Sequence, residues 1–248
     1  MGILEQARDR FLALCRERAV DMDGPVIVRP LSPDEAIGPK ADAGFVIKKG
    51  KERVIEAAAS GARGQAFTDR PTSWSGRVED LLVLDLSQVP CRAVFVAGMN
   101  AVLRALGAAE GTVHCTDEDP TRCGPEVARA LQDRLGRVRV GLIGLQPSIL
   151  AALADRFGPD SVRVLDLNPD NIGATKSGVP VWDGNTELDR LVAWCDVGLA
   201  TGSSVVNGSI DDIAHRFRES AKPLLFFGNT ISGTAALLGL DRLCPFGR

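Results

Sequence analysis

The side chains with the greatest capacity for chemistry lie together in one short segment, residues 111–124. This segment contains two thiols, one of the two imidazoles in the chain and three carboxylates. Thiolate and imidazole bind zinc, copper and iron–sulfur centres, whereas carboxylate binds harder ions. These residue types therefore indicate a transition metal ion or an iron–sulfur centre as cofactor. The candidate metal ligands are His114, Cys115, Asp117, Glu118 and Cys123.

The spacing of these residues also permits a purely structural interpretation. Seven residues separate Cys115 from Cys123, a wider gap than the paired cysteines of a structural zinc site have. His114 and Cys115 are adjacent, so in an extended chain their side chains point to opposite faces and do not reach one ion. The alternative is an acidic, solvated loop before a helix, in which the two cysteines are small buried hydrophobic residues.

Composition limits the classes of partner. The chain of 248 residues suits one large domain or two small ones, and 45% hydrophobic residues are enough for a core. The net charge is -3 and no sustained basic run occurs, which argues against nucleic acid or an anionic membrane as partner. Tyr is absent, so platforms for base stacking are scarce as well.

The sequence also favours a cytoplasmic location. No apolar stretch reaches the length of a transmembrane helix, and the first residues are charged and amphipathic, unlike a signal peptide. The six cysteines are spread through the chain, as expected for reduced thiols in a cytoplasm. A homodimer is the default expectation for the oligomeric state.

The first part of the chain gives a mixed pattern. Expected elements are a helix at 3–16, a strand at 26–28, a strand at 44–47, a basic turn at 48–53, a helix at 52–60, a surface loop at 61–76 and a helix at 92–106. Asn100 lies in an apolar part of the last helix. Because a buried Asn must be hydrogen-bonded, either the backbone satisfies it or it faces a ligand.

The second part alternates strand and helix, which predicts an α/β domain with a parallel sheet. The expected strands are 138–143, 162–165, 179–182, 196–200 and 223–227, and the 179–182 segment is a short strand or an edge piece because it contains Pro180. The first expected helix begins at Pro125, because proline suits a first helical position. Further helices are expected at 149–157, 188–194 and 210–217.

Small and polar residues follow four of these strands, and parallel sheets bind ligands at the carboxyl ends of their strands. Asp166 ends the second strand of the sheet, where a dinucleotide-binding fold places an acid on a ribose. However, residues 141–147 do not match G-x-G-x-x-G, so ordinary turns are the alternative. The candidate cofactor-binding residues are Asn100, Gly144, Asp166, Asn168, Thr201, Gly202, Ser203, Asn207 and Thr230.

Three common catalytic motifs do not occur. There is no G-x-S-x-G, no Walker loop and no H-E-x-x-H, and His215 is expected to face solvent from a helix. No catalytic residue is therefore assigned from the sequence.

The second half of the chain resembles the heavy-metal chelation family of bacteria and archaea. The resemblance is carried by residues 140–144 with Pro147, by 164–169, by the T-G-S-S-V-V-N-G-S loop at 201–209 and by 228–230. Residues 92–106 look like the helix between the two domains of that family. The likeness covers the last 155 residues well and the first 90 loosely.

The resemblance implies an enolase-N-terminal-like α/β domain over residues 1–110, a Rossmann-like domain over 111–248 and a site between them. It also implies metal handling, near corrinoid or other metal-cofactor pathways. We therefore expect an intracellular protein that binds a metal ion or a small metal-containing ligand in this cleft. The alternatives are a nucleotide- or S-adenosylmethionine-dependent enzyme and a non-catalytic accessory protein that passes metal to a partner.

Overall fold

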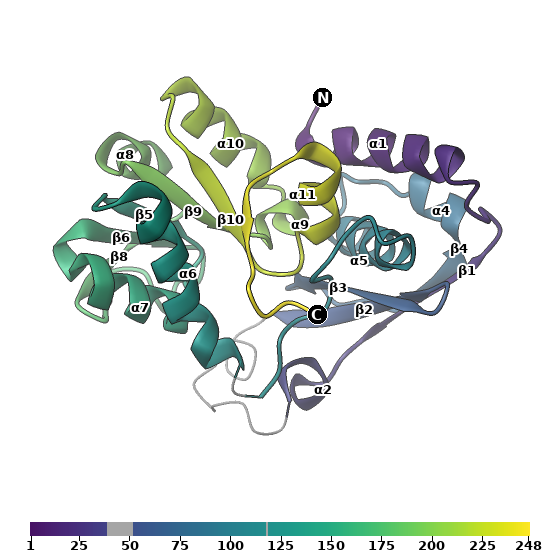
Figure 1. Ribbon diagram of the computed structural model, residues 1–248, viewed down its shortest axis with the longest axis horizontal. Coiled ribbons are helices and arrows are strands. Elements are labelled where there is room, and N and C mark those ends of the chain that lie inside the picture. Colours follow the sequence, from purple (N-terminus) through teal and green to yellow (C-terminus); the bar gives the residue numbers. More distant parts are fainter. Residues whose placement is uncertain (39–51, 118) are drawn as a thin grey trace.

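The computed structural model describes residues 1–38, 52–117 and 119–248. It is an α/β protein with a small antiparallel sheet built from the first part of the chain and a larger, mostly parallel sheet built from the second (Figure 1). The strand predicted at 44–47 and most of the turn predicted at 48–53 lie outside the described residues. Within these ranges no helix is long and apolar enough to cross a membrane.

The small sheet has the strand order β3-β2-β1-β4. Its strands are β1 (Pro25–Pro30), β2 (Arg53–Ala59), β3 (Ala62–Thr68) and β4 (Trp74–Arg77). The helices of this part are α1 (Ile3–Glu17), α2 (Pro33–Ile37), α4 (Val78–Leu82) and α5 (Val89–Ala105). The predicted strand at 26–28 and the helices at 3–16 and 92–106 are thus confirmed, with somewhat different bounds.

Two predictions for this part are wrong. The helix expected at 52–60 is strand β2, and the loop expected at 61–76 contains strands β3 and β4. The run of alanines at the end of β2 favours a helix by propensity alone, but pairing within a sheet overrides propensity. Ser60 and Gly61 both have positive φ and form the two-residue turn of a β2–β3 hairpin, the geometry that matches strand twist.

Helix α5 is the central element of this part and packs on the small sheet. Eleven consecutive residues, 93–103, are buried, so the helix is apolar on nearly all sides, as expected of a helix inside a core. At Gly64 of β3 the backbones almost touch, because a Cβ there would lie 2.3 Å from the Ala101 nitrogen. Only glycine allows this approach between strand and helix.

The large sheet has the strand order β11-β10-β9-β5-β6-β8-β7, and all neighbours are parallel except β7 and β8. Its strands are β5 (Val140–Ile143), β6 (Val162–Asp166), β7 (Thr175–Lys176), β8 (Val179–Asp183), β9 (Val197–Thr201), β10 (Leu224–Phe227) and β11 (Arg242–Leu243). The predicted parallel sheet and its five strands are confirmed. The strand order reverses between β5 and β9, where the connections diverge and ligands commonly bind.

Helices cover both faces of the large sheet (Figure 1). Its helices are α6 (Asp119–Leu135), α7 (Pro147–Phe157), α8 (Leu188–Trp194), α9 (Ser204–Asn207), α10 (Ile210–Glu219) and α11 (Ser232–Leu238). Helices α6 and α7 share one apolar cluster with the sheet. Helices α8 to α11 lie in a second cluster that continues into α1, α5 and the small sheet, so the core is continuous between the two sheets.

The start of α6 differs from the prediction. The helix begins at Asp119, and Pro125, expected at its first position, lies inside it. A proline in a helix leaves the carbonyl four residues earlier without its usual partner. Here the Ser148 hydroxyl from the start of α7 donates to that carbonyl, Thr121 O, at 3.0 Å. The long-range bond makes the internal proline tolerable, and no local pattern reveals it.

A buried amide joins the small sheet to the large one. Asn100 of α5 is fully buried, and its Nδ2 donates to Gln65 O at 3.1 Å and to Thr230 O at 3.0 Å, with a longer contact to Asn229 O. Its Oδ1 accepts from Gly233 N at 2.7 Å. One side chain thereby connects β3 to the segment between β10 and α11.

We predict that Asn100→Ala strongly destabilises the fold. The substitution leaves buried backbone groups on both sheets without a partner, and it should lower the free energy of unfolding by about 3 kcal/mol or more. Asn185→Ala, at an exposed position with local bonds only, is the matched control and should change stability by less than about 1 kcal/mol. Urea unfolding of both variants measures this; equal effects would contradict the role assigned to Asn100.

Candidate functional site

The segment after α5 is held in place by the C-terminal residues of the chain. Val113 and Arg248 exchange two backbone hydrogen bonds of 2.9 Å each. The Arg248 guanidinium lies 3.0 Å from the Asp119 carboxylate, and the Arg122 guanidinium lies over the Phe246 ring at 4.9 Å. Residues 244–248 and the start of α6 therefore enclose the cysteine-bearing segment from two sides.

Three cysteines from three separate segments come together here. We call Cys115, Cys123 and Cys244 the thiol cluster. Burial raises the pKa of Cys115, and negative charge on Cys123, Cys244 and Asp119 raises it further. Burial likewise raises the pKa of Cys123 to about 12, again with contributions from Cys244 and Asp119. All three sulfurs are thus close enough to influence one another's charge, and all three are neutral thiols near pH 7.

Cys244 shares this environment but also has a cation beside it. Burial raises the pKa of the Cys244 thiol, while the Arg242 guanidinium acts in the opposite direction. Cys115 is almost fully buried, whereas Cys123 and Cys244 are half-buried. An ion reaching the cluster would therefore first meet the two less buried thiols.

Two of the other predicted metal ligands, His114 and Asp117, make contacts of their own with neighbouring segments. The imidazole of His114 packs edge-on against Phe67, and its Nδ1 contacts the carbonyl oxygen of Cys115. Burial lowers the pKa of His114 to about 4, so the ring is neutral. Asp117 lies against Gly38 and donates its backbone N–H to Ile37 O at 2.7 Å. Glu118 lies outside the described residues.

The cluster is not a preformed coordination sphere. In the ranges that the structure describes, no three side chains of His, Cys, Asp or Glu are arranged to hold one metal ion. Two thiolates are sufficient for a soft ion of low coordination number. A third sulfur would have to turn toward the ion upon binding.

A second candidate site lies where the strand order of the large sheet reverses. A small cavity of about 90 Å³ opens at the carboxyl ends of β5, β6 and β9. It is lined by Ile143, Gly144, Leu165, Asp166, Leu167, Gly184, Leu188, Thr201, Ser204, Asn207, Ser209, Asp212 and Ile213. Four of the predicted cofactor-binding residues, Gly144, Asp166, Thr201 and Asn207, are therefore brought together.

The remaining predicted residues of this set do not line the cavity. Asn168 and Ser203 donate their backbone N–H groups to Asp166 and Thr201, and Gly202 is buried against Ile231. Asn100 and Thr230 are buried at the junction between the sheets, where Thr230 Oγ1 accepts from Phe67 N at 3.1 Å. Their place in the core separates them from the cavity.

Several backbone N–H groups in the loops beside this cavity are occupied by the protein. Asp166 accepts from Leu145 N at 2.9 Å and from Asn168 N at 2.7 Å. The side chain of Gln146 accepts from Ile149 N at the start of α7. A dinucleotide-binding loop leaves such N–H groups free for phosphate, and a nucleotide needs several times this volume. The geometry therefore weighs against a nucleotide in this conformation.

The charges near the small cavity also disfavour a nucleotide. Burial, then the negative charges of Asp166 and Asp69, raise the pKa of Glu52 to about 7. Three carboxyl groups thus gather where the start of β2 approaches the end of β6. Such a gathering repels phosphate and leaves Glu52 partly protonated near neutral pH.

Sequence reasoning missed Cys244, Asp119 and Glu52 as members of these sites. Cys244 and Cys115 are brought together by long-range contacts, such as the pairing of Val113 with Arg248 and the bond from Arg242 to Gly111 O, for which no local pattern exists. Asp119 belongs to an acidic run, and nothing in that run distinguishes it from its neighbours. The count of six cysteines is the one signal in the sequence for Cys244.

Comparison with known proteins supports a relationship through the large sheet. Residues 127–239 match the DUF364 family model, described as "Putative heavy-metal chelation". No curated protein matches. All three residues of the thiol cluster lie outside the matched range, whereas the small cavity at β5, β6 and β9 lies within it.

Two solved structures are similar in fold. A protein of unknown function from the DUF364 family of Pyrococcus horikoshii is 16% identical, with a TM-score of 0.54, over 92% of this chain and 79% of that chain. A DUF364 protein of unknown function from Desulfitobacterium hafniense DCB-2 is 13% identical, with a TM-score of 0.46, over 75% and 72%. Only the first likeness is strong enough to support the fold. Residues 127–239, somewhat less than half of the chain, therefore match the DUF364 family model, and the fold is similar to that of the Pyrococcus horikoshii protein from this family.

Proposed function

We propose that this protein binds a soft transition-metal ion at the thiol cluster, as cargo rather than as a fixed part of the fold. The observation that carries the proposal is the meeting of Cys115, Cys123 and Cys244 from three separate segments, where charge on Cys244 raises the pKa of both other thiols and charge on Cys123 raises that of Cys115. Sulfur ligands select copper(I), zinc and iron–sulfur centres over hard ions. The family description, heavy-metal chelation, agrees with this class of ligand.

The electrostatics of the cluster explain how an ion would be held. Because burial and mutual repulsion keep the thiols neutral, a cation must displace their protons before it binds. Once it does, the positive ion replaces the repulsion between thiolates by attraction, and the buried surroundings strengthen that attraction. Asp119 adds negative charge, while its ion pair with Arg248 keeps the segment that carries Cys244 in place.

His114 and the acids have a supporting role in this proposal. The Nδ1 of His114 faces the Cys115 carbonyl, which leaves Nε2 as its free nitrogen. Ligation by His114, Asp117 or Glu118 remains a prediction, as does binding of a cofactor at the small cavity. We also propose an enolase-N-terminal-like fold for the first part of the chain and a Rossmann-like fold for the second, with a domain boundary near residue 110, together with a cytoplasmic location and a homodimer.

We predict that Cys→Ser substitutions in the thiol cluster weaken metal binding. Cys123→Ser and Cys244→Ser should each lower the affinity for cadmium(II), a spectroscopic probe for thiolate sites, by roughly 10- to 100-fold. The matched control is Cys91→Ser, which lies outside the cluster and should bind as the unaltered protein does. Titration monitored by the sulfur-to-cadmium absorption band measures the affinity.

Two outcomes would contradict the site. Full affinity in the triple variant Cys115→Ser/Cys123→Ser/Cys244→Ser would exclude the thiols as ligands. Loss of binding in Asp166→Asn, with binding kept in the triple variant, would move the ion to the small cavity at the carboxyl ends of the strands. Urea unfolding of the metal-free variants establishes that each is folded.

We also predict a steep dependence of metal affinity on pH. Since the thiol pKa values lie well above neutral, every thiolate formed on binding releases one proton throughout the neutral range. With two thiolates, affinity should rise about 100-fold for each unit of increasing pH between about 6 and 8. Proton release measured in weakly buffered solution gives the number directly. Affinity that is constant over this range would be incompatible with thiol ligands.

A further inference from the structure

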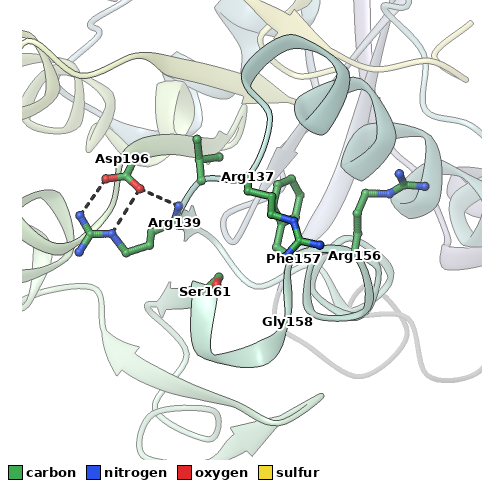
Figure 2. A pocket seen from close by; sticks show the side chains of 8 residues that line it. Arg137, Arg139, Arg156, Phe157, Gly158, Ser161 and Asp196 are labelled. Carbon is green, nitrogen blue, oxygen red and sulfur yellow. Dashed lines mark hydrogen bonds and ion pairs between the residues drawn. The ribbon is translucent and has the colours of Figure 1, made fainter.

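A second and larger hollow lies at the opposite edge of the large sheet from the small cavity. It has a volume of about 410 Å³ and is formed where β5, β6 and β9 begin. Figure 2 shows the pocket with its lining residues, Arg137, Val138, Arg139, Arg156, Phe157, Gly158, Ser161 and Asp196. We call it the arginine pocket. It shares no residue with the thiol cluster or with the small cavity.

The charges of this pocket are unbalanced. Arg139 is paired with Asp196, with 2.8 Å between Nη2 and Oδ1. Arg156 donates to a neutral amide, Gln132 Oε1, at 2.7 Å. In the described part of the chain, the Arg137 side chain has neither a hydrogen bond nor an ion pair, and in Figure 2 it lies between the Arg139–Asp196 pair and Phe157. Three arginines and one carboxylate therefore leave two positive charges without a carboxylate partner.

Helix ends reduce this charge but do not cancel it. Helices α6 and α7 both finish near the pocket, at Leu135 and Phe157. The carboxyl end of a helix carries roughly half a negative charge, so the two ends together supply about one. Two unpartnered arginines against about one negative charge leave the hollow positive. Low-dielectric walls concentrate that potential inside a cleft.

The other walls define the kind of molecule that fits. Val138 and Phe157 are half-buried and give an apolar surface, and the Ser161 hydroxyl adds a hydrogen-bonding group. The volume lies in the range of pockets for small organic molecules. Guanidinium groups match the oxygens of phosphate in pairs. A phosphate also has more oxygens than a carboxylate with which to reach both arginines that lack a carboxylate partner.

We propose that the arginine pocket binds a small organic phosphate, with the phosphate on Arg137 and Arg156 and the apolar part on Val138 and Phe157. Such a ligand would occupy the second edge of the sheet independently of a metal ion at the thiol cluster. The protein would then bind two small ligands of opposite charge, a metal cation at the thiol cluster and an organic phosphate at the arginine pocket. This inference stands apart from the proposed metal function and is tested separately from it.

Titration calorimetry with phenyl phosphate as the probe tests the proposal on the full chain. We expect Arg137→Gln/Arg156→Gln to weaken binding at least tenfold. The matched control is Arg10→Gln/Arg104→Gln, which removes the same charge from α1 and α5 and should leave binding unchanged. Because all four arginines are exposed, both variants are expected to fold, and their urea unfolding midpoints check this.

Three results would overturn the proposal. One is the absence of binding by the unaltered protein at millimolar phenyl phosphate. Another is an equal loss of affinity in both double variants, which would mean attraction to overall charge only. The third is equal affinity for phenyl phosphate and inorganic phosphate, which would remove the role of Val138 and Phe157. A preference for phenyl phosphate that disappears in Phe157→Ala would support the apolar contact.

Discussion

The buried amide of Asn100 is the constraint on which the arrangement of this protein depends. A carboxamide in a core has to find partners for both its donors and its acceptor, and here these come from β3, from the turn before α11 and from the first turn of α11 itself. The first residue of α11 also holds the segment after α5, since Ser232 Oγ donates to Gly111 O at 2.7 Å. The position of the thiol cluster thus follows indirectly from a residue that makes no contact with it.

Periodicity is sufficient to predict the large sheet. Its strands are short apolar runs such as Val140–Ile143, separated by helical patterns, and this alternation is encoded locally. The small sheet is harder, because the alanines of β2 and the glycines and prolines of residues 61–76 have propensities that pairing overrides. Pro125 and Cys244 show the limit most clearly. Each depends on a partner distant in sequence, Ser148 for one and the 113–248 pairing for the other.

The predicted site residues also differ in how far a sequence pattern is able to place them. Gly144, Asp166, Thr201 and Asn207 converge because the carboxyl ends of parallel strands must share one edge, a rule that a sequence pattern is able to invoke. The adjacent residues His114 and Cys115 face different surroundings, since the imidazole packs against Phe67 while the thiol lies in the thiol cluster. The two edges of the large sheet also differ in charge. Carboxyl groups gather at one and arginines at the other, which no composition reveals.

The pairing of residues 244–248 with the segment after α5 makes the thiol cluster a property of the folded chain alone. In an unfolded chain, Cys115 and Cys244 are separated by nearly the whole large-sheet domain. An ion that joins them would act as a reversible cross-link across a very long loop, and closing such loops removes entropy from the unfolded state. Metal content and resistance to unfolding would then rise and fall together, so loss of the ion would also loosen the structure that released it.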